Sequence, residues 1–288
     1  MKPMEITFYR SKNLDESVCA SVTLPATWAE IQDAKDRARF TNDREGGVFS
    51  EAGYMEMDEI EEIYAPSQAS ELARAEVPVV LQVRNAYSTH PELDDAPAVL
   101  LELPMDSYKM NAATGILEAG SLSDCVYTCV NCRIPQLKPL IDRAEDLEAV
   151  NEFAKALANM VGSAVLYKAI LEELNPPDLE SAMTLLSETE EYILDETLVT
   201  SIDYAERFLD KHRADSEEFA LLAKCVDVGQ LGHELLLRDN VAPTAYGFLR
   251  RKDGEPLQEM GPSLKTPKPL QQSELEQSAW PKFSEYGQ

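Results

Sequence analysis

The spacing of apolar residues divides the chain into a mixed first half and a helical second half. Apolar and polar residues alternate in short segments, which predicts strands at 4–10, 17–24, 77–84, 98–103 and 125–130. Between the second and third of these, Thr27 and Glu30 have the spacing of a capping box, which predicts a helix from there to about Phe40. From about residue 136 to 238 apolar residues recur every three or four positions, which predicts helices over 147–160, 165–174, 179–186, 202–209 and 219–226. The pattern therefore predicts an α+β fold.

These changes in pattern also predict the domain organisation. Residues 1–135 form a mixed α/β N-terminal region with room for two small modules, and 136–260 form a mainly helical region. That region ends in a predicted hairpin over 244–254, whose turn would be Asp253-Gly254. Residues 261–288 are Pro-rich without periodicity, and we expect a loosely docked tail there.

Two predicted strands end in the same dipeptide. The segments 20–25 and 100–104 both place apolar residues ahead of Leu-Pro. A match this short has two explanations, chance and a duplicated module, and the sequence leaves both open.

Charge changes the picture most. The 288 residues include 52 Asp and Glu but 26 Lys and Arg, which gives a net charge of −26, while 44% hydrophobic residues are enough to build buried cores. A pI near 4.4 argues against binding nucleic acid or anionic membrane through a basic surface. No apolar run is long enough for a membrane span, and the first residues lack the apolar core of a signal peptide. Together with five unevenly spread cysteines, which suit reduced thiols, this predicts a cytoplasmic protein.

Standard catalytic signatures are missing. The sequence has no phosphate-binding loop, dinucleotide fingerprint, zinc-protease motif or nucleophile elbow. Its three histidines, His90, His212 and His233, are too few and too scattered to favour a triad or a His-rich metal site. We therefore expect no enzyme activity, no catalytic residues, no cofactor and no metal.

One group of cysteines has the spacing of a known metal-cluster site. Cys125, Cys129 and Cys132 have the C-x3-C-x2-C spacing of the cluster loop in radical S-adenosylmethionine enzymes. However, a helical segment follows, and a zinc site would lack a nearby fourth ligand. We favour the interpretation that Cys125 and Cys129 are small apolar residues of a strand, and keep a Cys-cluster metal enzyme as the lesser alternative.

The carboxylates are the stronger candidate. Between residues 142 and 196 there are 14 acidic residues against three basic ones, and residues 51–62 hold six acids and no base. Glu145, Glu148 and Glu152 form one stripe on a predicted helix, although like charges at such spacing destabilise a helix. A merely solvated face is one interpretation, and a surface that offers anions to a basic partner is the other. The candidate partner-binding residues are Glu56, Asp58, Glu59, Glu61, Glu62, Asp142, Glu145, Asp146, Glu148, Glu152, Glu172, Glu173, Asp178, Glu180, Glu188, Glu190, Glu191, Asp195 and Glu196.

A comparison of charge makes the second interpretation specific. Double-stranded DNA carries two charges per base pair, so a net charge of −26 equals the phosphate charge of roughly 13 base pairs. Carboxylates held on helices could therefore occupy a groove whose Lys and Arg residues hold phosphates.

Three stretches have the order of motifs seen in a known family. They are 23–32 (TLPATWAEIQ), then 147–157 (LEAVNEFAKAL) followed by 177–185 and 200–209, and finally 228–235 (VGQLGHEL) with 244–248 (TAYGF). Together they resemble the ArdA antirestriction family of conjugative transposons and plasmids, whose members mimic DNA. The chain departs from that family in its cysteine segment, in its Pro-rich tail, and in Leu231-Gly-His where Leu-Gly-Arg is usual.

The resemblance implies an elongated, multi-module acidic protein, often a dimer. Such a protein would occupy the DNA-binding groove of a type I restriction-modification enzyme and keep that enzyme off unmodified incoming DNA, without catalysis. Its partners would be the DNA-binding subunits of that enzyme, with no direct binding to nucleic acid or membrane. The alternative is an acidic adaptor or inhibitor from a mobile genetic element that binds another basic host protein.

Overall fold

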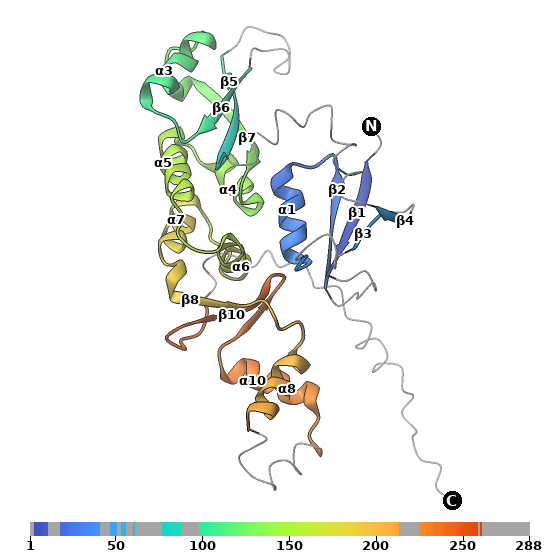
Figure 1. The fold of residues 1–288 in the computed structure, drawn as a ribbon. Coiled ribbons are helices and arrows are strands. Elements are labelled where there is room, and N and C mark those ends of the chain that lie inside the picture. The colour runs from blue at the N-terminus through green and yellow to red at the C-terminus, as the bar shows by residue number, and fades with distance from the viewer. Residues whose placement is uncertain are drawn as a thin grey trace, which may run out of the picture.

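The chain folds into an elongated α+β structure, as the sequence pattern predicted. The computed structural model describes residues 3–10, 18–40, 47–50, 53–55, 60, 77–87, 98–212, 225–258 and 260. Within these ranges lie eight α-helices and three small antiparallel sheets. In Figure 1 helix α3 lies at one end of a long body, helices α8 and α10 lie at the other, and the first sheet lies beside the middle.

The first unit is a four-stranded sheet, in the order β2-β1-β3-β4, covered by one helix. Its elements are β1 (Met4–Tyr9), β2 (Cys19–Leu24), α1 (Trp28–Arg37), β3 (Gly47–Ser50) and β4 (Gly53–Met55). The capping box is present, because the Thr27 side chain accepts from the Glu30 backbone and the Glu30 side chain accepts from the Thr27 backbone. Ile6, Phe8 and Ile31 belong to an apolar cluster of this unit alone, so it has a core of its own.

The second unit repeats the first. It consists of β5 (Val79–Asn85), β6 (Ala98–Leu103), α3 (Ser107–Ile116) and β7 (Cys125–Cys132), with a short 3-10 turn, η2 (Leu122–Asp124), before the last strand. The sheet order β6-β5-β7 corresponds to β2-β1-β3, and every pairing is antiparallel.

The correspondence extends to single positions. The helix N-caps Thr27 and Asp106 lie 79 residues apart, as do the left-handed residues Arg39 and Glu118 that follow the helices. Phe8 pairs with Ala20 and Val48, and Val83 pairs with Val99 and Tyr127, so both flanking strands keep the offset of 79. Both units also have a cis Leu-Pro peptide directly after the second strand. The shared Leu-Pro dipeptide therefore marks a duplicated module.

The rest of the chain forms a mainly helical body that shares its core with the second unit. Its elements are η3 (Pro135–Leu137), α4 (Lys138–Arg143), α5 (Leu147–Ala158), α6 (Ala164–Leu174), α7 (Leu179–Ser187), η4 (Thr189–Glu191), β8 (Tyr192–Asp195), α8 (Ser201–His212), α10 (Val228–Arg238), β9 (Ala242–Thr244) and β10 (Gly247–Arg251). One apolar cluster runs from Val79 through the helices to Leu249, so the core does not divide at residue 135. A smaller cluster, which includes Leu236 and Phe248, joins α10 to β10.

The sequence prediction misplaced one turn and missed several elements. The hairpin turn is Ala245-Tyr246, between β9 and β10, and the residues after β10 form a separate turn at Lys252-Asp253. Helix α3 of the second unit and the short strands β3, β4 and β8 had no counterpart in the predicted elements. Of the other predictions, most of the helix at 219–226 and all of the tail at 261–288 lie outside the described residues.

Helices α8 and α10 pack closely because Gly232 has no side chain. A Cβ atom at Gly232 would lie 2.1 Å from the carbonyl oxygen of Ser201, whereas one at Gly229 would lie 3.4 Å from a side-chain oxygen of Asp227. We expect Gly232→Ala to force the helices apart and lower the free energy of unfolding by about 1–3 kcal/mol. Urea unfolding measures this, with Gly229→Ala as the matched control. Equal stability of the two variants would contradict the expected contact.

Candidate partner-binding surface

The structure places most of the predicted carboxylates at the surface. Five of them, Glu56, Asp58, Glu59, Glu61 and Glu62, lie outside the described residues. Of the remaining fourteen, twelve are exposed, and Glu173 and Asp195 are half-buried.

Helix α5 holds the acidic stripe in a fixed orientation. Asp146 caps the helix by accepting a hydrogen bond from the backbone N–H of Glu148 at 2.9 Å. Val150, Phe153 and other apolar residues are buried on one face, so Glu148 and Glu152 are held on the opposite face. Glu145 is also exposed but precedes the N-cap, so it does not lie on the helix as the stripe prediction had it. The helix therefore fixes only Glu148 and Glu152 of the predicted stripe.

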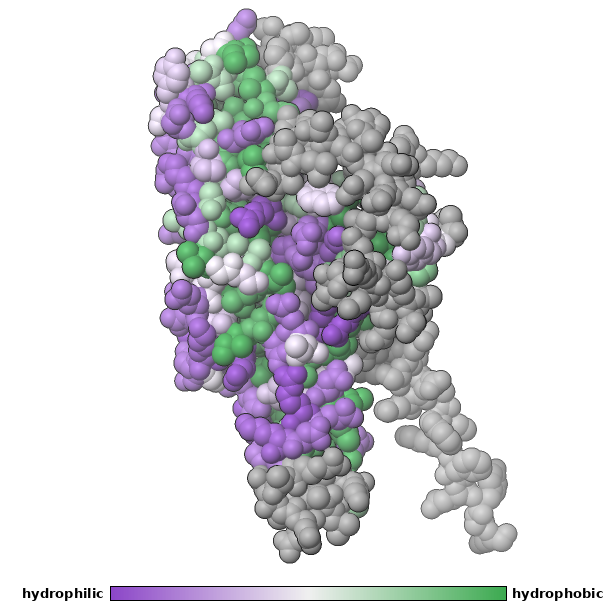
Figure 2. Space-filling view, viewed as in Figure 1, coloured by the Kyte–Doolittle hydropathy of each residue, from purple (hydrophilic) through white to green (hydrophobic). Residues whose placement is uncertain are grey.

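Helix α7 continues the acidic surface. Asp178 is its N-cap and accepts from the backbone N–H of Ser181 at 2.8 Å, a hydrogen bond that lowers the pKa of the Asp178 carboxyl. Leu179, Ala182, Leu185 and Leu186 are buried, and Glu180 is exposed on the other face. In Figure 1 α3, α5 and α7 follow one another down the left side of the body. Figure 2 shows hydrophilic residues (purple) along that side, with hydrophobic positions (green) between them.

Some of these carboxylates have a structural partner inside the chain. Asp142 accepts from the backbone N–H of Cys129 at 2.6 Å, and Glu172 accepts from that of Ala245 at 3.0 Å. Ion pairs also join Glu152 to Lys155, Glu191 to Arg251 and Asp195 to Arg207. Burial alone would raise the pKa of Asp195, but hydrogen bonds from Thr197 and Arg207 outweigh it, so that pKa is lowered.

The other exposed carboxylates have no such partner. Within the described residues, six of them make no side-chain hydrogen bond or ion pair, and we call these the unpaired carboxylates: Glu145, Glu148, Glu180, Glu188, Glu190 and Glu196. The Arg39 guanidinium attracts Glu196 without forming an ion pair with it, and all six carboxylates remain available to a partner.

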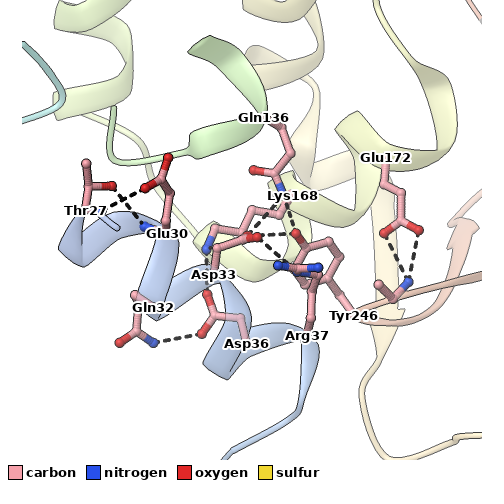
Figure 3. Close-up of polar contacts among 11 residues, drawn as sticks. Thr27, Glu30, Gln32, Asp33, Asp36, Arg37, Gln136, Lys168, Glu172 and Tyr246 are labelled. Atoms are coloured by element: carbon pink, nitrogen blue, oxygen red, sulfur yellow. Dashed lines mark hydrogen bonds and ion pairs between the residues drawn. The ribbon is translucent and has the colours of Figure 1, made fainter. Parts of the chain in front are cut away.

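A second group of carboxylates, which the sequence analysis did not single out, lies buried between the first unit and the body (Figure 3). The Lys168 ammonium on α6, only 2% exposed, lies 2.7 Å from Asp36 Oδ2 and 3.2 Å from Asp33 Oδ1, both on α1. Tyr246 and Gln136 also donate to Asp33 Oδ1, at 2.8 and 3.1 Å, and Arg37 Nε donates to Oδ2 at 3.1 Å. We call this cluster the buried joint.

The buried joint positions the modules by polar contacts. Burial raises the pKa of the Tyr246 hydroxyl, and the neighbouring Asp33 carboxylate raises it further, so Tyr246 stays protonated and donates. A lysine in the otherwise apolar run 164–171 of α6 was the available sequence signal, since a buried lysine requires an anionic partner. Lys168 therefore balances carboxylates inside the protein and leaves the surface charge unreduced.

The cysteine segment is a strand, as the favoured interpretation had it, but Cys125 is only partly buried, and Cys132 is the second buried thiol beside Cys129. Cys129 pairs with Leu81 and Cys132 with Val79, and an irregularity between these pairs lets both thiols point into the core although they are three residues apart. Burial raises the pKa of both thiols, that of Cys132 to about 12. Among the described residues, which include all five cysteines, no group of three or more His, Cys, Asp or Glu side chains is arranged to hold a metal.

These environments predict which thiols react. Cys19 and Cys225 are exposed, whereas Cys129 and Cys132 are buried and stay protonated at pH 8. We expect a chromogenic disulfide reagent to modify Cys19 and Cys225 rapidly in the folded protein, and Cys129 and Cys132 only after unfolding in urea. Mass spectrometry of the labelled peptides identifies the sites, and rapid labelling of Cys132 would contradict the buried strand.

Across the described ranges, no helix is long and apolar enough to cross a membrane. Comparisons with protein-family models, curated proteins and solved structures found no match for this chain.

Proposed function

We propose that the protein is a DNA mimic that occupies the DNA-binding groove of a type I restriction-modification enzyme and blocks it without catalysis. The observation that carries the proposal is the set of six unpaired carboxylates, of which four lie on or at the ends of α5 and α7, one on η4 and one after β8. The resemblance of three segments to ArdA proteins supports the choice of target.

Rigidity is the physical reason why such a surface can replace a duplex. Phosphates are fixed along DNA, so the Lys and Arg residues that hold them are arranged for fixed anions. When a helix is packed on the core by one face, the backbone that carries its exposed carboxylates loses little further conformational freedom on binding. The backbone of a flexible tail would have to be ordered first. The long body with α5 and α7 on one side offers such an array (Figure 1).

The mode of binding follows from the charge. A net charge of −26 accelerates the encounter with a positively charged groove at low salt, and ion pairing makes the affinity fall as salt rises. A homodimer, which the resemblance implies, would double the charge presented.

A competition assay tests the proposal. Labelled duplex DNA is bound to the methyltransferase core of a type I enzyme, and the protein is then titrated in. We expect complete displacement, with an apparent inhibition constant that rises in proportion to the DNA concentration and with salt. If excess protein displaces no DNA from a panel of type I cores at low salt, the target is wrong. Recovery from host lysate of a basic protein that does not bind DNA would then favour the acidic adaptor.

A further inference from the structure

A hollow with a mixed lining, partly apolar and partly polar (Asn159, Thr184, Ser187 and Thr189), interrupts the acidic surface where α5 and α7 meet. It has a volume of about 510 Å³, and its apolar lining includes Met160 and Val161 after α5, and Met183 on α7. Glu180 and Glu190, two of the unpaired carboxylates, also line it. The Val161 side chain is 77% exposed and that of Met183 is 44% exposed, so neither side chain is buried in the core of the protein.

Phosphate-like charge alone does not account for this hollow. A DNA backbone presents anions and sugars but no concave apolar surface between them, so exposed valine and methionine add nothing to a purely electrostatic mimic. Exposed apolar side chains that line a hollow, with polar residues at its edge, are typical of an interaction site. The connection that carries Val161 is short, because the chain turns at Gly162, with a φ of +113°, and Ser163 already caps α6.

The combined lining indicates what the hollow accepts. Its apolar part suits a hydrocarbon chain, and its two carboxylates suit a cation at the end of that chain. Arginine combines both, because its methylene stem packs on apolar surface while its weakly hydrated guanidinium offers several donors to carboxylates.

We propose that this hollow binds an arginine side chain of the partner's DNA-binding groove. The inference rests on the proposed function for the identity of the partner and deepens it. The arginine stem would lie on Val161, Met160 and Met183, and its guanidinium would reach Glu180 and Glu190. The contact would therefore contribute affinity that salt does not screen, in addition to the ion pairs of the rest of the surface.

Two double variants separate these contributions in the competition assay. We expect Val161→Ser with Met183→Ser to weaken displacement of DNA by about tenfold at every salt concentration, because apolar burial is lost while the charge is unchanged. Glu180→Gln with Glu190→Gln should weaken displacement and also reduce its salt dependence. The matched control is Tyr108→Ser with Leu237→Ser, since these side chains are 84% and 75% exposed on α3 and α10. An unaltered inhibition constant for the Val161 and Met183 variant would overturn the proposal.

A second measurement needs no restriction enzyme. The methionine methyl groups are labelled with ¹³C, and N-acetyl-argininamide is titrated in at millimolar concentrations, with the neutral isostere N-acetyl-citrullinamide as control. The Met160 and Met183 signals, assigned with single Met→Leu variants, should shift with the arginine probe and much less with the citrulline probe. No shift, or equal shifts with both probes, would reject an arginine site.

The two measurements separate the two proposals. Arginine-specific shifts without displacement of DNA from any type I core would leave the hollow standing and reject the proposed function. Displacement of DNA that is insensitive to the Val161 and Met183 substitutions would support the proposed function and reject the arginine site.

Discussion

Replacing the six unpaired carboxylates by glutamine should weaken inhibition of a type I enzyme by roughly a hundredfold. Exposed ion pairs contribute about 0.5 kcal/mol each, so six of them contribute about 3 kcal/mol. None of the six has a side-chain partner in the described structure, so the fold should be unaffected. Any single replacement, such as Glu148→Gln, should change the inhibition constant by less than about threefold. The measurement is displacement of labelled DNA at fixed salt, with circular dichroism to check folding.

A control with the same change in net charge makes this result specific. Six other exposed carboxylates, on elements other than α5 and α7, serve for it: Glu5, Glu102, Glu118, Glu206, Asp210 and Glu234. Their replacement by glutamine, or by asparagine at Asp210, should weaken inhibition by less than about tenfold, because only long-range attraction is reduced. Equal losses in the two variants would mean that total charge matters and that the position of the six unpaired carboxylates does not.

Lys168→Met should lower the free energy of unfolding by about 3–5 kcal/mol, the largest effect we expect from one substitution. The Lys168 ammonium is 2% exposed and lies between Asp33 and Asp36, so its removal leaves two largely buried carboxylates with one cation, the partly exposed Arg37. The matched control is Lys138→Met, because the ion pair of Lys138 with Glu30 is partly exposed and should cost less than about 1 kcal/mol.

The unfolding curve should also show where the stability is lost. The first unit has its own apolar cluster, separate from that of the body, and the buried joint fastens the two. In Lys168→Met we expect α1 and its sheet to unfold at lower urea concentration than the body. Urea unfolding followed by circular dichroism, with hydrogen exchange of α1, measures this. A single unfolding transition as stable as that of Lys138→Met would show that the joint contributes little.

Local signals in the sequence were reliable where the structure depends on local contacts. The capping box at Thr27 and the N-cap Asp178 satisfy backbone groups within one turn, so neighbouring residues suffice to predict them. The hairpin turn was misplaced because Asp-Gly is the stronger turn signal, whereas Ala245-Tyr246 depends on side chains outside the turn. The Thr244 hydroxyl accepts from the Tyr246 and Gly247 backbone, and Glu172, far away in the sequence, accepts from the Ala245 backbone. Helix α3 was missed because its exposed face includes Tyr108 and Ile116, so its apolar residues do not form a single stripe.

For the candidate site, the sequence predicted charge but not its distribution. Glu148 and Glu152 lie on the exposed face of α5, as helical spacing predicted, whereas Glu145 is exposed but lies before the helix. The division between structural and unpaired carboxylates depends on partners far away in the chain, such as Arg251 for Glu191. The hollow also needs two helices in contact, so no single stretch of sequence indicates it.

The duplicated module shows where this architecture tolerates added length. From the second strand through the helix to the third strand, equivalent residues of the two copies are 79 positions apart in the sequence. Equivalent residues of the two first strands are only 75 positions apart. The connection between β5 and β6 is therefore four residues longer than that between β1 and β2, while the paired strands are in the same register. Since the same scaffold closes with either loop, the segment between Tyr87 and Ala98 is a suitable position for a genetically inserted fluorescent or affinity tag.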